Sequence, residues 1–268
     1  MLKQRILTAL LIGLPVIAVL LWLPPQLTVV LFAVVVLMAG WEWSALARLQ
    51  RPLLRVLYLL ALAAGMLFSW LYLRDPAPLH ALLQVSLAWW LVALLWILFR
   101  PLSMLQPLAV LAGLLVLVPA WLALTLIHLQ PLAGPQWVLF LFLMVVSADI
   151  GGFLFGRRFG HSKLAPRVSP GKTWEGVAGG LLLSMVIAAA GVWWFKVPMQ
   201  EFLLLCLCTV LMSIVGDLTE SLFKRHAGLK DSGTLLPGHG GVLDRIDSIT
   251  AAAPVFLAGL LYTGVFAP

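Results

Sequence analysis

Long apolar stretches recur along almost the whole chain, and short polar connections separate them. Nine stretches approach or exceed about 18 residues, the length at which a helix crosses a hydrocarbon core of about 30 Å. Many end near helix breakers such as Pro76 and Pro198. The pattern predicts an all-α integral membrane protein, one polytopic domain over residues 1–268. The predicted spans are residues 6–23, 27–47, 56–73, 81–99, 105–129, 136–156, 177–195, 201–219 and 249–266.

Composition supports this prediction and excludes other classes of protein. The chain is 63% hydrophobic and 10% charged, with a mean hydropathy of +1.08, so it has too few polar groups to cover a soluble globule. Its apolar residues exclude a disordered tail, and its two cysteines exclude a disulfide scaffold. The net charge of +7 would by itself suggest a nucleic-acid partner, but the distribution of that charge indicates otherwise.

The basic residues are concentrated on one side of the predicted membrane. Of the 17 Lys and Arg residues, 15 fall on the N-terminus or on connections that share its side. Cytoplasmic loops carry such an excess, so we expect the N-terminus in the cytoplasm and the C-terminus outside the cell membrane. The positive charge is therefore a topology signal in a multi-pass inner-membrane protein, and we expect no nucleic-acid partner.

The acidic residues are distributed differently, because eight of the ten lie in residues 149–247. We therefore expect residues 1–135 to be mainly scaffold and residues 136–268 to carry the catalytic spans and loops. The aromatic residues of the first half are typical of lipid-facing packing or an interfacial belt. Glu42, between Trp41 and Trp43, is the exception there. Carboxylates at membrane depth are costly, so Asp149 and Asp217 need a partner, a polar cavity or a metal.

The connection at residues 157–176 combines cations with glycines and contains the motif S-P-G-K-T-W-E-G at 169–176. The motif superficially resembles a phosphate-binding P-loop, but the G-x-x-x-x-G-K-[ST] spacing is missing and no strand is expected before it. A basic loop rich in free amides still suits a phosphate group.

The connection at residues 221–247 is the most informative part of the sequence. Its Gly-rich and Pro-rich centre indicates a loop with free backbone amides. Asp244 and Asp247 lie three residues apart, as Asp217 and Glu220 do, so each pair shares one helix face. Two facing pairs of carboxylates could hold hard cations while nearby Lys and Arg contact phosphates. This is the chemistry of phosphoryl or nucleotidyl transfer.

At these residues the chain resembles the CDP-diacylglycerol synthases, also called phosphatidate cytidylyltransferases. Their signature, S-x-[apolar]-K-R-x4-K-D-x-[GSA]-x2-[LIF]-[PG]-x-H-G-G-[apolar]-x-D-R-[apolar]-D, is matched at every specified position from 221 to 247. The glycines after Asp149 and the motif at 169–176 look like a second conserved region of that family. The resemblance covers residues 145–250 in detail, and the earlier spans only in hydropathy.

The resemblance implies a membrane enzyme that joins CTP to phosphatidic acid, using Mg²⁺ and releasing pyrophosphate. It leaves the identity of any second cation open, and it also implies a homodimer. By resemblance, the catalytic residues are Asp217, Asp244, Asp247, Lys224 and Arg245; the nucleotide and phosphate contacts are Lys172, Thr173, Arg225, Lys230, His239, Gly240 and Gly241; and the metal ligands are Asp217, Asp244 and Asp149.

Two alternative functions fit the sequence less well. A CDP-alcohol phosphotransferase would show D-G-x2-A-R followed by two spaced aspartates, and the chain has no such motif. A polytopic transporter would use Asp149 and Asp217 as an intramembrane relay. The candidate residues crowd onto one membrane face and no repeat is visible, which argues against a transporter.

The charge distribution makes a direct prediction of topology. A reporter fused after Pro268 should be extracytoplasmic, and one inserted between Lys163 and Arg167 should be cytoplasmic. Reporter enzyme activity on each side of the membrane measures this. The opposite pattern would contradict the nine-span arrangement and would move the candidate site away from cytosolic CTP.

Overall fold

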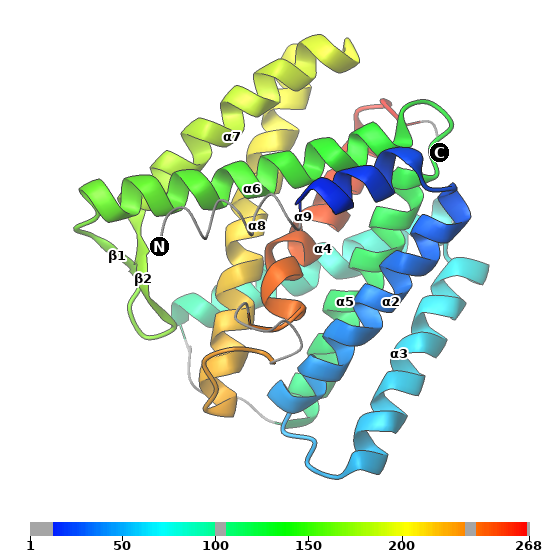
Figure 1. Ribbon diagram of the computed structural model, residues 1–268, viewed down its shortest axis with the longest axis vertical. Coiled ribbons are helices and arrows are strands. Elements are labelled where there is room, and N and C mark those ends of the chain that lie inside the picture. Colours follow the sequence, from blue (N-terminus) through cyan, green and yellow to red (C-terminus); the bar gives the residue numbers. More distant parts are fainter. Residues whose placement is uncertain (1–12, 100–105, 234–239, 267–268) are drawn as a thin grey trace.

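The computed structural model describes residues 13–99, 106–233 and 240–266. Eight helices in this part of the chain are long and apolar enough to cross a membrane (Figure 1). A shorter apolar helix, Gly13–Trp22, precedes them and belongs to the predicted first span, whose first residues lie outside the described part. The long helices are α2 (Pro25–Leu46), α3 (Pro52–Tyr72), α4 (Pro76–Phe99), α5 (Gln106–His128), α6 (Gly134–Phe159), α7 (Trp174–Phe195), α8 (Met199–Ala227) and α9 (Leu243–Tyr262).

The predicted all-α membrane fold is confirmed, with corrections at the helix ends that matter for the site. Helix α8 continues to Ala227, eight residues past its predicted end, and α9 begins at Leu243 rather than at residue 249. The predicted spans stopped where charged residues begin. Lys, Arg and Glu are good helix formers, however, so the helices continue beyond the apolar core. As a result, most of the acidic and basic signature residues lie on helices.

Helix α5 lies at the centre of the bundle and packs against α2, α3, α6 and α9. The aromatic residues near it correct one expectation from the sequence. Trp43 and Trp90 are each only 1% exposed and belong to the core, so neither faces lipid. The Trp43 indole donates a hydrogen bond to the Ala109 carbonyl of α5 at 2.9 Å, and its ring lies 4.8 Å from that of Phe223 on α8. Trp43 thus fixes α2 against both helices.

Helices α6 and α7 form the most extensive helix pair, and they lie side by side at the top of Figure 1. Glycines make this close approach possible. A Cβ added to Gly151 would overlap the Gly179 carbonyl, and one added to Gly180 would lie 2.7 Å from the Ala148 carbonyl oxygen. Small residues allow helix backbones to approach closely within a membrane. Gly151, one of the glycines that follow Asp149, therefore acts as a packing residue.

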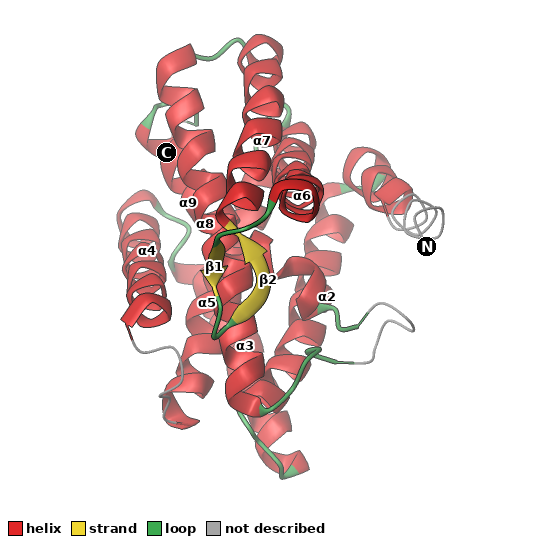
Figure 2. Cartoon of the chain, turned by 90° about the vertical axis from the view of Figure 1, so that its left-hand side faces the viewer, coloured by secondary structure: helices red, strands yellow, loops and turns green. Residues whose placement is uncertain are grey.

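The connection between α6 and α7 forms a two-stranded antiparallel hairpin, which the sequence did not predict (Figure 2). Its strands are β1 (Lys163–Ala165) and β2 (Ser169–Thr173). Val168 is buried with Leu218 and Leu222 of α8, and Leu164 packs against the same cluster. This apolar contact holds the basic hairpin against α8.

The tight α6–α7 contact can be tested with two neighbouring glycines. Gly151→Ala should lower the melting temperature in detergent, because the added methyl group overlaps the α7 backbone and such overpacking costs about 1–3 kcal/mol. Gly152→Ala is the matched control, since its nearest neighbour would lie at an ordinary 3.7 Å. Its melting temperature should stay unchanged or rise. Equal melting temperatures for both variants would show that the contact is not tight.

Candidate active site

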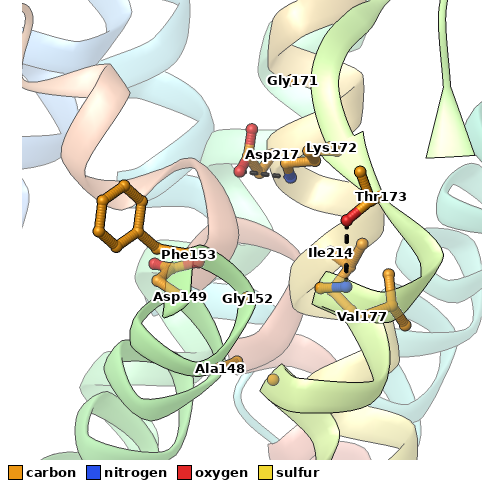
Figure 3. A pocket seen from close by; sticks show the side chains of 12 residues that line it. Ala148, Asp149, Gly152, Phe153, Gly171, Lys172, Thr173, Val177, Ile214 and Asp217 are labelled. Carbon is orange, nitrogen blue, oxygen red and sulfur yellow. Dashed lines mark hydrogen bonds and ion pairs between the residues drawn. The ribbon is translucent and has the colours of Figure 1, made fainter. Parts of the chain in front are cut away.

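A pocket of about 370 Å³ lies between α6, α7, α8 and the end of β2 (Figure 3). Its walls are mostly apolar, and two carboxylates and one ammonium group supply its charge. Asp149 comes from α6, Lys172 from β2 and Asp217 from α8. The pocket thus joins the connection at residues 157–176 to helices α6 and α8. The lining residues are Ala148, Asp149, Gly152, Phe153, Gly171, Lys172, Thr173, Gly176, Val177, Gly180, Ile214 and Asp217.

Lys172 and Asp217 form an ion pair across the pocket, with 2.5 Å between Nζ and Oδ2. Both side chains remain about a quarter exposed, at 28% and 26%, so a ligand can reach them. Asp149 lies within electrostatic range of both groups. The structure therefore brings together three residues that are 23 and 45 positions apart in the sequence.

The start of α7 holds the end of the hairpin in place. Thr173 is the N-cap of α7, and its hydroxyl accepts a hydrogen bond from the Gly176 amide at 3.2 Å. Glu175 in the first turn accepts from the Ser162 amide at 3.1 Å, which closes the hairpin from the other side. Thr173 is buried, so its hydroxyl serves the helix cap. These contacts determine where the neighbouring Lys172 points.

A second charged cluster lies deeper, between α8 and α9. The Lys224 ammonium group donates to Glu220 Oε2 at 2.8 Å and to Asp244 Oδ1 at 2.6 Å. The other Asp244 oxygen accepts from the amides of Ser232 at 3.0 Å and Gly241 at 2.8 Å. Lys224 and Asp244 are only 13% and 12% exposed. This ion-pair cluster joins the end of α8 to the start of α9.

The two pairs of carboxylates predicted on α8 and α9 do face each other. Asp247 lies against Glu220 and within electrostatic range of Asp217. Glu220 Oε1 is buried and receives no hydrogen bond within the described part of the chain. Two adjacent carboxyl groups need a shared proton or a cation between them. The donor set therefore fits a hard cation in its chemistry.

The described residues do not, however, form a closed metal cage. No three His, Cys, Asp or Glu side chains among them lie close enough together to enclose an ion. Asp217 and Asp244, two of the predicted metal ligands, are each paired with a lysine. The metal role of Asp149, Asp217 and Asp244 stays a prediction.

The remaining predicted residues lie around these two clusters. Arg225 donates from Nε to the Val168 carbonyl at 3.3 Å and so contacts the hairpin turn. Lys230 and Arg245 are exposed beside the α8–α9 connection. Gly240 has a φ of +79°, a conformation that favours glycine, and a Cβ there would lie 2.8 Å from Asp244 Oδ2. Gly241 donates the amide described above, and His239 lies outside the described residues.

Two residues at the deeper cluster were not among the predicted site residues. Ser232 contacts Asp244 through its amide and its hydroxyl. Glu42 of α2 accepts a hydrogen bond from the Ser232 hydroxyl and is only 3% exposed. The signal for Glu42 in the sequence is a carboxylate inside an apolar span, but that signal does not indicate which helix Glu42 contacts.

Comparison with known proteins shows the family to which the chain belongs. The model of the cytidylyltransferase family matches residues 3–263, nearly the whole chain. The chain belongs to the cytidylyltransferase family. This result supports an enzyme and argues against the transporter alternative.

Several bacterial proteins named phosphatidate cytidylyltransferase are similar to this chain. The one from Pseudomonas aeruginosa is 44% identical, covering 100% of both chains. The one from Haemophilus influenzae is 39% identical, over 96% of this chain and 97% of its own. The one from Brucella suis is 46% identical over 53% of each chain. The likeness therefore extends beyond the signature segment to the early spans.

The two lysines of the site should differ in their contribution to stability. Lys224→Met should lower the melting temperature strongly, because it leaves the buried carboxylate of Glu220 and the mostly buried carboxylate of Asp244 without their cation, and breaking a buried pair costs about 3–5 kcal/mol. Lys172→Met should change it little, because that ion pair is partly exposed and screened. Thermal unfolding of both variants in the same detergent measures this. Equal losses would contradict the distinction between a buried and an accessible pair.

Proposed function

We propose that this protein makes CDP-diacylglycerol and pyrophosphate from CTP and phosphatidic acid. The observation that carries the proposal is the similarity to phosphatidate cytidylyltransferases over the full length of both chains. The accessible Lys172–Asp217 pair in a pocket among membrane-spanning helices supports it, because the substrates are a water-soluble triphosphate and a lipid phosphate.

In this reaction a phosphate oxygen of phosphatidic acid attacks the α-phosphorus of CTP. A new P–O bond forms, the bond to the β-phosphate breaks, and pyrophosphate leaves with the electron pair. A phosphate monoester is already largely anionic at neutral pH, so no strong general base is required. The site must instead neutralise and align phosphate charge.

Lys172 is the cation best placed to contact a phosphate in the pocket. Its ammonium group is accessible, and the hairpin and the α7 cap determine its position. Lys224 is engaged by two carboxylates and serves to hold Asp244 in place. The mostly apolar walls, including Phe153 and Val177, suit the lipid substrate. The acyl chains would remain in the bilayer while the headgroup enters the pocket.

We further propose Mg²⁺ as the cofactor. The residues that would hold it are Asp217 and Asp244, with Asp149 as a third carboxylate and Asp247 beside them. When bound, Mg²⁺ would neutralise charge on the reacting phosphates. The carboxylate donors fit this ion, and the orphaned oxygen of Glu220 supports a cation close to Asp247.

The proposed setting is the bacterial inner membrane, with the site on the cytoplasmic side where CTP is available. The basic excess on one side of the membrane supports this orientation. A homodimer stays a prediction based on family resemblance.

The function is tested with purified protein, labelled CTP, phosphatidic acid and Mg²⁺. Both CDP-diacylglycerol and pyrophosphate should form in equal amounts, and a chelator should abolish turnover until Mg²⁺ is restored. Absence of both products would refute the proposed reaction. Full turnover in chelator would refute only the metal requirement.

In the same assay, Asp244→Asn and Asp217→Asn should each lose nearly all turnover while the protein remains folded. Asn keeps the size of the side chain but removes the charge that a hard cation requires. Asp75→Asn is the matched control, since Asp75 is exposed and remote in sequence from both clusters, and its turnover should be unchanged. Wild-type turnover of both site variants at limiting Mg²⁺ would exclude them as ligands.

A further inference from the structure

Helix α2 contributes a carboxylate, that of Glu42, to the α8–α9 connection near Asp244. The carboxylate of Glu42 accepts three hydrogen bonds from residues about 200 positions further along the chain. Oε1 accepts from the Val242 amide at 3.0 Å, and Oε2 accepts from the Leu243 amide at 2.8 Å. Oε2 also accepts from the Ser232 hydroxyl at 3.0 Å.

These contacts place Glu42 at the N-terminus of α9. Val242 is the N-cap of that helix, and its own side chain provides no cap. The first amides of a helix have no partner within the helix, and they carry the positive end of its dipole. An anion from another helix supplies both the missing hydrogen bonds and the complementary charge. Glu42 is therefore the cap of α9, provided from α2.

The surrounding backbone is shaped to the Glu42 side chain. A Cβ added to Gly233 or Gly241 would overlap the Glu42 carboxylate, so only glycine allows the segment to close around it. The neighbouring Trp43 fixes this end of α2 against α5 and α8. The position of the Glu42 side chain is therefore fixed, and the residues that precede Asp244 are held against it.

A continuous chain of hydrogen bonds links Glu42 to the deeper charged cluster. The Ser232 hydroxyl donates to Glu42 and accepts from the Asp244 amide at 3.3 Å. The Ser232 amide donates to Asp244 Oδ2, and Asp244 Oδ1 accepts from Lys224. Each hydrogen bond in this series restricts the orientation of the side chains that it joins.

Arg48, two residues after the end of α2, contacts the other end of the α8–α9 connection. Arg48 donates from Nη2 to the His226 carbonyl in the last turn of α8. A cation at a helix C-terminus and an anion at a helix N-terminus both complement the helix dipole. Figure 1 shows the end of α8 and the start of α9, in orange, near this end of α2.

We propose that Glu42 is a positioning residue for Asp244: it caps α9 and holds Ser232 and the Val242–Leu243 backbone so that the Asp244 carboxylate is presented correctly to the reaction. The role of Asp244 in the reaction rests on the proposed function. Glu42 does not line the pocket, so it acts through the backbone and Ser232 rather than on the substrate.

The test is Glu42→Gln, with Ser44→Ala as the matched control. Gln keeps the size but loses the charge and one acceptor oxygen, so an amide N–H₂ would face the donors of Val242, Leu243 or Ser232. Ser44 is also buried at this end of α2, but its hydroxyl donates to the Trp41 carbonyl and accepts from Arg55, both in the α2–α3 region. Turnover and hydrogen–deuterium exchange of residues 240–247 are measured for both variants.

We expect Glu42→Gln to lower kcat about 100-fold, the scale expected when a reacting group is misplaced by about 1 Å, with a much smaller change in the KM for CTP. Exchange at the amides of Val242 and Leu243 should accelerate. Ser44→Ala should keep wild-type kcat and wild-type exchange in this segment. Unchanged kcat in Glu42→Gln, or unchanged exchange at these amides, would overturn the proposal.

Ser232→Ala keeps the experiment decisive if Glu42→Gln does not fold. It removes one hydrogen bond to Glu42 and should lower kcat about tenfold, with faster exchange at the Asp244 amide. Wild-type kcat and exchange in Ser232→Ala would overturn the proposal. If the unaltered protein forms no CDP-diacylglycerol, the proposed function fails, while the exchange data still decide whether Glu42 holds this segment.

Discussion

The structure depends on compensating charges that lie among membrane-spanning helices. A carboxylate or ammonium group removed from water is costly unless a partner neutralises it. The Lys224 ammonium group meets this requirement for Glu220 and Asp244 at once, and in doing so it joins α8 to α9. Lys172 does the same for Asp217 from the hairpin. Each ion pair therefore also links two elements of the fold.

The two pairs differ in accessibility, and this difference divides their roles. The Lys172–Asp217 pair lies in a pocket and is partly exposed, so a charged ligand can compete for either partner. The Lys224 cluster is nearly closed, and its lysine is already shared by two carboxylates. The close α6–α7 contact through Gly151 and Gly180 brings Asp149 to the same pocket. Close backbone packing and ion pairing thus act together to assemble one site from three helices and a hairpin.

The N-terminal half contributes more to this site than a passive scaffold would. Glu42 of α2 caps α9, and Arg48 just after α2 contacts the last turn of α8, so this part of the chain engages both ends of the α8–α9 connection. These charges lie six positions apart, Glu42 in α2 and Arg48 just after its end. The division at residue 135 stays a prediction, but these contacts cross it. A change in α2 can therefore alter the position of Asp244 without touching the pocket.

The sequence alone determined the class of fold and the residue types of the candidate site, because span length and charge spacing are local properties of the chain. Apolar runs long enough to cross a bilayer predicted the helices, and the Asp217 and Asp244 motifs predicted two facing acidic pairs. Only the tertiary structure decided which charges are partners. The pairing of Lys224 with Asp244 depends on α8 packing against α9, and the hairpin depends on burial of Val168 against Leu218. Glu42 could be recognised as unusual, but its role as a cap depends on contacts about 200 residues away, which no local pattern specifies.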